Sequence, residues 1–339
     1  MNQSTIGLLM LILAGLMNAT FTLPMKFTRR WAWENTWLLW TIFALLLLPP
    51  VVAIFTVPQL GDVYHSVNSS TILSVAGFGF GWGIAQIFFG LAVESIGIAL
   101  IFSLVLGTSA AVGTLLPLLR LHPERLHTTS GHGLLAGVFI ALVGVAICAV
   151  AGRSREATLR SNTPTERKSS TGGLLLAVIC GFGASLVNFG LAFGAPLLVA
   201  AQRHGAGVVS SANAVWLPLM LAGAIPNLFY CVLVMRKNRT AGRFSSGGFT
   251  YWILVALMAL FWFGSTLLYG AAASHLGVLG PILGWPLFMS LIVITASLLG
   301  VLTGEWKHAG RKPLLIQLGG VAILIIAVFV LAATNRNLS

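Results

Sequence analysis

Charged side chains are scarce in this sequence of 339 residues. Asp, Glu, Lys and Arg together make up 8% of the chain, whereas soluble globular proteins carry about 25%. The hydrophobic fraction is 57% and the mean hydropathy is +0.95. This balance excludes an ordinary soluble domain and predicts a protein that crosses a membrane several times. The net charge of +12 does not indicate a nucleic-acid partner, because the cations lie in short loops between apolar runs.

Groups that carry enzymatic or metal chemistry are also few. The sequence has no HExxH or GxSxG motif, no paired carboxylates and no Cys/His cluster. Three histidines of one loop, His122, His127 and His132, could hold a metal, but histidines in a short polar connection are more often solvated. The three cysteines lie in apolar runs and are interpreted as small buried hydrophobes: Cys148, Cys180 and Cys231. We expect no enzyme, no bound metal and no cofactor.

Apolar runs of roughly 20 residues, the length that crosses a bilayer as a helix, dominate what is present. The first run has no basic segment ahead of it and no small-residue cleavage site, so we interpret it as a retained helix rather than a signal peptide. We predict an all-α membrane protein with ten transmembrane helices, at residues 5–25, 36–57, 71–93, 97–119, 133–151, 172–194, 210–235, 250–272, 278–302 and 314–333.

The basic residues predict how these helices are oriented. The loops after the first, third, fifth, seventh and ninth run hold 15 of the 19 Lys and Arg residues. Cytoplasmic loops carry the excess of Lys and Arg in membrane proteins. This side is therefore expected to be cytoplasmic, and both termini are expected to face the periplasm.

The two halves of the chain resemble each other. GLLMLILAG at Gly7 is echoed by GLLLAVICG at Gly173, and ESIGIAL at Glu94 by SHLGVLG at Ser274. Five helices are an odd number, so the second copy would enter the membrane upside down. Inverted repeats are typical of secondary transporters, which bind substrate near the midplane between the halves. We predict a first five-helix repeat at 1–151, a polar cytoplasmic linker at 152–171 and an inverted repeat at 172–339.

The third apolar run, 71–93, is rich in glycine and carries two polar groups at its centre. Glycines let a neighbouring helix or a ligand approach the backbone closely. Trp82 and Gln86 are four residues apart and share one face of a helix. An indole beside an amide at mid-depth favours a polar cavity that holds a flat, hydroxylated ligand. The alternative, equally weighted for this run alone, is a helix-packing seam with Gln86 bonded to a neighbour.

Other polar and aromatic residues lie in the later runs. Trp262 and Tyr269 are seven residues apart and share a face of the eighth run. Trp285 lies between Pro281 and Pro286, where a broken helix start would free backbone groups for a ligand. The sixth and seventh runs add amides that are candidates for substrate binding: Asn188, Asn213 and Asn227. Each alone is more often packing, but several Trp and amide groups without a fixed charge indicate a neutral sugar, because a cationic ligand would need a buried counter-ion.

Two acids, Glu34 and Glu94, lie at ends of apolar runs where a transported proton could bind. Glu34 is close in sequence to Lys26 and Arg29, so the alternative is an interfacial ion pair. His275, which titrates near neutrality, is a third candidate. Glu305 lies in a loop that also contains Lys307, Arg311 and Lys312. These cations should keep its carboxylate ionised, so we interpret Glu305 as a structural group.

Several segments resemble the L-rhamnose–proton symporters of the drug/metabolite transporter superfamily. The matching pieces run over nearly the whole length: FTLPMK at Phe21, WAWENTW at Trp31, WGIAQIFFGL at Trp82, IPNL at Ile225, WPLFMS at Trp285 and EWKHAGRKP at Glu305. Of these, WAWENTW and EWKHAGRKP are the most specific. The resemblance implies ten helices and inward transport of sugar with protons across a bacterial inner membrane. It carries family positions onto six residues: Glu34, Trp82, Asn227, Trp262, Tyr269 and Trp285. Gln86 stands where the family is expected to have an Asn.

We therefore expect a secondary transporter that takes up a neutral deoxyhexose such as L-rhamnose with protons by alternating access. Its partners would be the sugar, protons and the lipid bilayer, with no nucleic acid, and we expect a monomer. One rival keeps the fold but exports amino acids, metabolites or drugs. The other rival, a membrane enzyme acting on lipid-linked substrates, would need convergent acids or histidines, which the sequence lacks.

Overall fold

The structure is a computed structural model. It describes the backbone of residues 3–96, 98–160, 171–307 and 309–336, and the side chains of these residues except 89–103, 159–160, 171 and 335–336. Every secondary-structure element in these ranges is helical. The first half contains α1 (Gln3–Thr20), η1 (Leu23–Phe27), α2 (Trp33–Thr41), η2 (Ile42–Leu47), α3 (Leu48–Thr56), α4 (Leu60–His65), α5 (Ser69–Ile96), α6 (Ile98–Leu121), η3 (Pro123–His127) and α7 (Thr129–Arg160). The second half contains α8 (Thr171–Phe193), α9 (Ala195–Arg203), α10 (Asn213–Asn238), η4 (Ala241–Ser246), α11 (Gly248–His275), α12 (Gly280–Leu302) and α13 (Arg311–Arg336).

Ten helical segments of the described chain are long and apolar enough to cross a membrane, which confirms the predicted number. Two boundaries differ from the prediction. α7 continues to Arg160, so the first residues of the predicted linker are helical, while 161–170 lie outside the described residues. The sixth span continues past Gly194 into α9, because Gly194 bends the chain without ending its helical course.

The second span is the irregular one. It consists of α2, the π-helical segment η2 and α3 in direct succession. Pro49 and Pro50 lie in the first turn of α3, lack an N–H donor and crowd the carbonyl groups four residues earlier. The preceding turn therefore widens to the π pattern, in which each N–H reaches the carbonyl five residues back.

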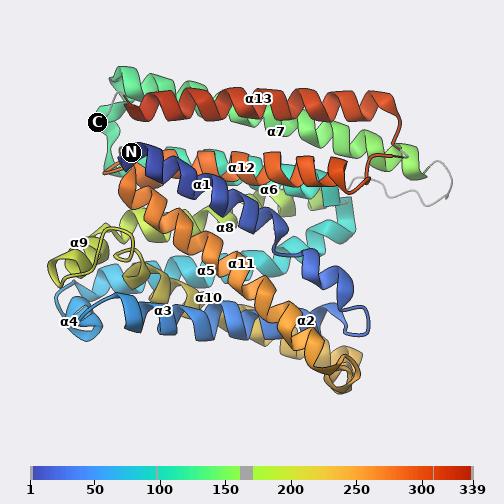
Figure 1. The fold of residues 1–339 in the computed structure, drawn as a ribbon, viewed down its shortest axis with the longest axis horizontal. Helices are drawn as coiled ribbons and strands as arrows, with labels where there is room; N and C mark the ends of the chain where they lie inside the picture. The colour runs from blue at the N-terminus through green and yellow to red at the C-terminus, as the bar shows by residue number, and fades with distance from the viewer. Residues whose placement is uncertain (1–2, 97, 161–170, 308, 337–339) are drawn as a thin grey trace.

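Figure 1 shows the helices as an elongated bundle with both chain ends on its left side. α7 and α13 lie side by side along one edge, and α11 crosses obliquely over the middle of the bundle. The short helices α4 and α9 lie together at the end that also holds the termini, and η4 lies at the other end.

The packing of the spans follows a regular scheme. α1 packs on α11 and α12, and α8 packs in the same way on α5 and α6. α7 packs on α13, and α6 on α12. The scheme is symmetric between the two halves of the chain. When each of the first five spans is exchanged with the span five places later, the contacts of α1 become those of α8. The pairs α7–α13 and α6–α12 are each converted into themselves.

Glycines of α5 allow the closest helix approach toward the centre of the bundle. A Cβ added at Gly79 would lie 1.9 Å from the carbonyl oxygen of Leu219, and one at Gly83 would lie 2.4 Å from that of Gly223. These two glycines therefore serve the packing of α5 against α10. The contact brings Trp82, which lies between them, against the backbone of α10 at Gly223.

Candidate functional site

Four tryptophans meet where the middle of α5 approaches the middle of α11. Trp82 and Trp262 stack with ring centroids 5.4 Å apart and an interplanar angle of 18°. Trp40 of α2 meets Trp262 edge-on at 5.1 Å, and Trp37 lies 4.6 Å from Trp40. We call these four residues together with Asn227 the tryptophan centre. Three of its members were predicted from the sequence to bind substrate: Trp82, Asn227 and Trp262.

Asn227 ties the tryptophan centre to the glycine contact. Trp37 Nε1 donates a hydrogen bond to Asn227 Oδ1 at 3.4 Å. Asn227 Nδ2 donates to the carbonyl of Gly223 at 2.9 Å and reaches that of Gly83 at 3.5 Å. The amide is therefore fully used in this arrangement, and it connects α2, α5 and α10.

Much of the other hydrogen-bonding capacity of this region is unused. Trp40 Nε1 is buried without a partner. Within the part of the chain that the structure describes, neither the indole N–H of Trp82 nor that of Trp262 donates a hydrogen bond, and the half-buried Gln86 amide makes none either. Buried donors without partners are costly, and they usually mark a site that something else completes.

A second group of predicted residues lies two turns farther along α11, toward its His275 end. Asn188 of α8 donates through Nδ2 to the carbonyl of Gly113 at 2.8 Å and to that of Pro281 at 3.1 Å. Its Oδ1 accepts a hydrogen bond from the Tyr269 hydroxyl. Trp285 Nε1 donates to the Ser109 carbonyl at 2.9 Å. We call Asn188, Tyr269 and Trp285 the amide centre.

The amide centre joins four helices and is closed. Asn188 and Tyr269 are fully buried, and Trp285 is nearly so. Tyr269 also stacks on Phe288 at 5.1 Å. Hydrogen bonds of the three side chains connect α6, α8, α11 and α12, so this centre holds the bundle together at this depth.

The expected break in the ninth span is absent. α12 begins at Gly280 with Pro281 in its first turn and continues as a helix through Pro286. A proline in the first turn fits a regular helix start, because the N–H that it lacks would have had no partner there. The prolines still leave the Pro281 carbonyl accessible, and it accepts from Asn188 and Tyr269 rather than from a ligand.

Asn213 lies apart from both centres. It is the first residue of α10, and its Nδ2 donates to Thr56 Oγ1, the last residue of α3, at 2.8 Å. The structure thus brings the predicted binding residues into two groups and leaves Asn213 at the end of the bundle near α4 and α9.

Comparison with known proteins places the whole chain in one family. The family described as L-rhamnose-proton symport protein (RhaT) matches residues 1–334. The chain belongs to this family. It is 30% identical over 334 residues to the L-rhamnose-proton symporters of Salmonella typhi, Salmonella paratyphi A and Cronobacter sakazakii, and each match covers 96% of both chains.

In this member of the family, Glu34 is buried near the start of the second span without a cationic partner. Its Oε1 accepts hydrogen bonds from Thr240 Oγ1 at 2.7 Å and from Asn238 Nδ2 at 3.1 Å. The ion pair with Lys26 or Arg29, the alternative interpretation, is not formed among the described residues. The partners instead come from the end of α10, about 200 positions away in the sequence, which the local charge pattern could not indicate.

The structure says less about Glu94 and His275, the other two candidate proton carriers. The Glu94 side chain lies outside the described residues, although its backbone belongs to α5. His275 ends α11 at the surface, where Nδ1 meets the Gln3 side chain. The loop histidines His122, His127 and His132 do not belong to any group of three or more potential metal ligands in the described residues.

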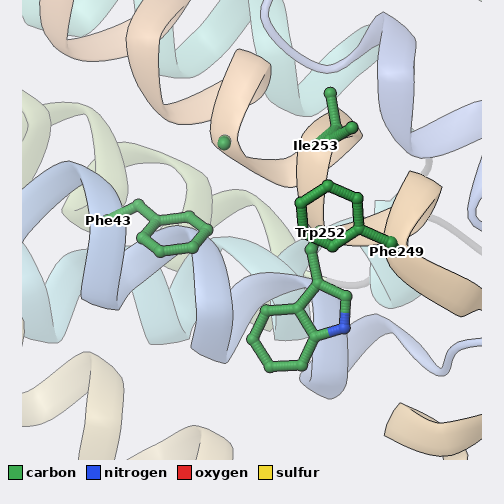
Figure 2. Close-up of a pocket in the computed structure, with 5 residues that line it drawn as sticks. Phe43, Phe249, Trp252 and Ile253 are labelled. Carbon is green, nitrogen blue, oxygen red and sulfur yellow. The ribbon is translucent and has the colours of Figure 1, made fainter.

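An open groove lies on the outside of the bundle, and none of the predicted binding residues lines it. Figure 2 shows Phe43 from the second span facing Phe249, Trp252 and Ile253 from α11, and Ala256 completes the lining. All five lining side chains are apolar. The groove therefore does not offer the polar groups that a sugar requires.

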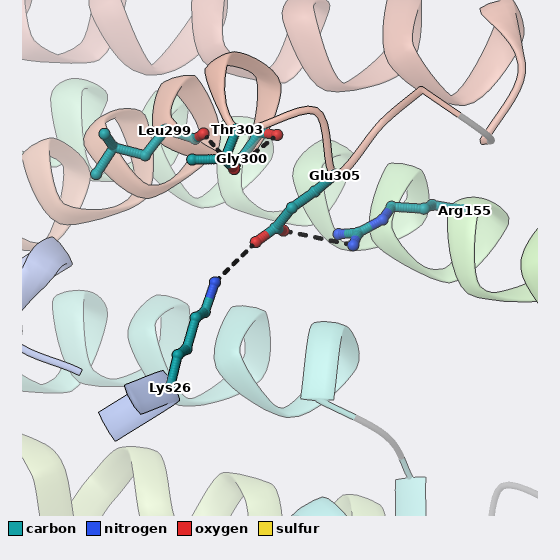
Figure 3. Close-up of polar contacts among 6 residues, drawn as sticks. All are labelled: Lys26, Arg155, Leu299, Gly300, Thr303 and Glu305. Atoms are coloured by element: carbon teal, nitrogen blue, oxygen red, sulfur yellow. Dashed lines mark hydrogen bonds and ion pairs between the residues drawn. The ribbon is translucent and has the colours of Figure 1, made fainter. Parts of the chain in front are cut away.

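The EWKHAGRKP segment forms an ion-pair junction at the end of the bundle opposite the termini. Figure 3 shows Glu305 between Lys26 and Arg155, with N–O distances of 3.5 and 3.4 Å. The Arg155 guanidinium also lies over the ring of Trp306 at 5.3 Å. Among the described residues, Lys307, Arg311 and Lys312 of its own loop form no ion pair with Glu305, and its cationic partners come from elsewhere in the chain.

Reasoning from sequence missed Trp37 and Trp40 as members of the site. The WAWENTW segment and the three residues after it carried the signal, because Trp33, Trp37 and Trp40 follow the spacing of one helical face. Tryptophans near a helix end are ordinarily interfacial anchors. Only the three-dimensional contact with Trp262 distinguishes Trp40 from such an anchor.

Proposed function

We propose that this protein takes up a neutral sugar, with L-rhamnose as the first candidate, together with protons across a bacterial inner membrane. The observation that carries this proposal is the tryptophan centre. The stacked indole faces of Trp82 and Trp262 lie beside Trp40, whose buried N–H has no partner. Indole faces suit the apolar C–H faces of a sugar, and the free donors suit its hydroxyls. The relatives are named L-rhamnose-proton symporters, and L-rhamnose is a neutral sugar of this kind.

The sugar is bound at the tryptophan centre when the bundle opens. Trp82 and Trp262 now contact each other directly, so a sugar needs them to separate before it can stack on either ring. Gln86 and Asn227 would then supply the hydrogen-bonding amides. The amide centre borders this site along α11, and the interpretation that Asn188, Tyr269 and Trp285 also contact sugar stays a prediction.

Glu34 is the proposed proton carrier. Its carboxylate is buried, lacks an ion pair and is held by neutral donors from α10. Hydrogen bonds from neutral donors favour the anionic carboxylate less strongly than a bound cation does, so protonation costs less here than in an ion pair. Glu94 keeps its place as the second candidate from the sequence.

Alternating access follows from two inverted five-helix repeats, 1–151 and 172–339. The exchange of packing pairs between spans five places apart supports this organisation. Both ends of the described chain lie at the same end of the bundle, as ten spans require. The charge distribution of the loops favours termini in the periplasm, where a C-terminal reporter that functions only in the periplasm should be active.

Transport by purified protein in proteoliposomes tests the function. An inward proton gradient should concentrate labelled L-rhamnose, and an uncoupler should abolish the accumulation. A panel of unlabelled hexoses and deoxyhexoses should compete in the order of their affinity. If no neutral sugar is concentrated or competes while the protein remains folded, the proposal fails.

The proton carrier is tested with Glu34→Gln and Glu94→Gln. Loss of the coupling group should abolish gradient-driven uptake but preserve sugar binding and counterflow exchange, because the neutral amide mimics the protonated acid. Glu305→Gln is the matched control in an exposed ion pair. If both Glu34→Gln and Glu94→Gln still concentrate sugar in response to a pH gradient, neither acid carries the proton.

A further inference from the structure

The groove lined by Phe43, Phe249, Trp252, Ile253 and Ala256 lies outside both centres and has no role in the proposed sugar transport. Its volume is about 440 Å³, within the range of about 300–1,000 Å³ for small-molecule pockets. Phe249, Trp252, Ile253 and Ala256 follow one face of α11, and Phe43 belongs to the π-helical segment of the second span. The groove is therefore an apolar channel between two membrane spans, open toward the outside of the bundle (Figure 2).

One end of this groove is bordered by arginines. Arg30 Nη1 donates to the Ser246 carbonyl at 3.2 Å, three residues before Phe249. Arg243 lies in η4, the 3₁₀-helix that ends at Ser246. Both arginines are exposed.

An aromatic cluster fixes this basic end to the groove. The ring of Trp31, next to Arg30, lies 5.8 Å from that of Trp252 and 5.2 Å from that of Phe244. Phe244, next to Arg243, lies 6.0 Å from Trp252. The neighbours of the two arginines, Trp31 and Phe244, thus pack against Trp252 at the mouth of the apolar channel through edge-on and tilted ring contacts.

The charge at the mouth is not neutralised by an ion pair. Among the described residues, neither Arg30 nor Arg243 forms a salt bridge within 4.0 Å. Glu34 lies within electrostatic reach of Arg243, but its carboxylate is buried and bonded to Thr240 and Asn238. An anion that approaches from outside therefore meets two available guanidinium groups.

We propose that this groove binds one anionic phospholipid, with an acyl chain along Phe43 and Ala256 and the phosphate between Arg30 and Arg243. An apolar channel within the membrane that ends in paired cations matches an amphiphile with an anionic head. Guanidinium groups suit phosphate because they donate two parallel hydrogen bonds. The proposal depends on the membrane location alone and is independent of the transported substrate.

The test measures lipid bound to the purified full-length chain. Phosphatidylglycerol that co-purifies is quantified by mass spectrometry, and the melting temperature is measured after addition of phosphatidylglycerol or phosphatidylcholine. Ala256→Trp fills the channel, and Arg30→Gln with Arg243→Gln removes the cations. Leu257→Trp, on the same helix outside the lining, and Arg311→Gln with Lys312→Gln, at the same end of the spans, are the matched controls.

Phosphatidylglycerol should raise the melting temperature of the original chain and of both controls more than phosphatidylcholine does. Each lost arginine should reduce lipid occupancy about fivefold, since a cation near an anionic lipid contributes about 1 kcal/mol. The double arginine variant keeps the test valid if Ala256→Trp fails to fold, because both arginines are on the surface.

Three results would overturn the proposal. Unchanged phosphatidylglycerol content in both groove variants would place the lipid elsewhere. An equal loss in the Arg311 and Lys312 control would mean diffuse attraction to the basic surface. Loss of self-association in Ala256→Trp with unchanged lipid content would identify the occupant as a second copy of the chain.

Discussion

The tryptophan centre and the amide centre are two turns apart on α11, and both contain bonded amides, yet only the tryptophan centre contains a buried indole N–H without a partner. In the amide centre, Asn188, Tyr269 and Trp285 all bond to protein groups. In the tryptophan centre the rings contact one another and Trp40 Nε1 has no partner. The difference separates side chains that hold helices together from side chains that are free to bind something else. Four experiments test the roles of these groups, beginning with the largest expected effect.

Asn188→Leu should have the largest effect, and it should appear in stability. The change leaves the Tyr269 hydroxyl and the carbonyls of Gly113 and Pro281 without their amide partner. We expect a loss of about 3 kcal/mol in the free energy of unfolding, since each stranded buried group costs about 1–3 kcal/mol. Unfolding of the purified protein measures it. Asn213→Leu, which breaks one bond to Thr56, is the control and should cost about 1 kcal/mol; equal losses would contradict the distinction.

Trp262→Ala and Trp285→Ala form the most direct comparison. Loss of the half-buried Trp262 ring should weaken sugar binding about tenfold, because an aromatic contact contributes roughly 1 kcal/mol or more. Trp285→Ala should act mainly on stability, since its N–H and ring are engaged by α6 and Tyr269. Equilibrium binding and thermal unfolding are measured on both variants. A tenfold affinity loss in both would mean that the two centres form one sugar site.

Trp40→Phe removes the unpartnered N–H while it keeps an aromatic ring. We expect a loss of stability from the smaller buried ring alone, because Trp40 is buried and no hydrogen bond is lost in this structure. Sugar affinity should fall about fivefold if this N–H donates to a hydroxyl in the bound state, the value of a hydrogen bond of about 1 kcal/mol. Titration with L-rhamnose measures it. Trp37→Phe, which breaks the bond to Asn227, is the control; an unchanged sugar affinity in Trp40→Phe would contradict the assignment.

Glu305→Gln lies outside both centres and should have the smallest effect. The carboxylate and its partners Lys26 and Arg155 are partly exposed. Exposed ion pairs contribute at most about 1 kcal/mol and are screened by salt. Unfolding at low and high salt should differ less for the variant than for the original chain. A salt-independent loss of several kcal/mol would show that this junction is as essential as the buried centres.

Composition and periodicity predicted most of the fold. Ten apolar runs became ten helices, because each must satisfy its own backbone in a membrane. The short helices α4 and α9 were not predicted, because six and nine residues are too few for a clear periodic pattern. The site was predicted only in part. The spacing of Trp262 and Tyr269 placed them on one face, but it could not assign one ring to a stack with Trp82 and the other to a bond with Asn188.

Partners that are distant in the sequence explain the remaining differences. Glu34 and Glu305 both lie near cations in the sequence, and both were interpreted through those neighbours. In the folded chain Glu34 is bonded to Asn238 and Thr240, and Glu305 to Lys26 and Arg155. Local charge patterns describe an isolated segment, whereas a bundle chooses partners from the helices that it packs together.

The π-helical segment of the second span sets the phase between its two ends. A π-helical turn holds one residue more than an α-helical turn, because each N–H bonds to the carbonyl five residues back instead of four. In an α-helix, one residue corresponds to about 100° of rotation. Deleting a single residue within Ile42–Leu47 would return the span to a plain α-helix. Trp37 and Trp40 would then turn by that angle relative to Thr56, away from Trp262. The edge-on contact between Trp40 and Trp262 thus depends on one inserted residue in the segment that follows Thr41.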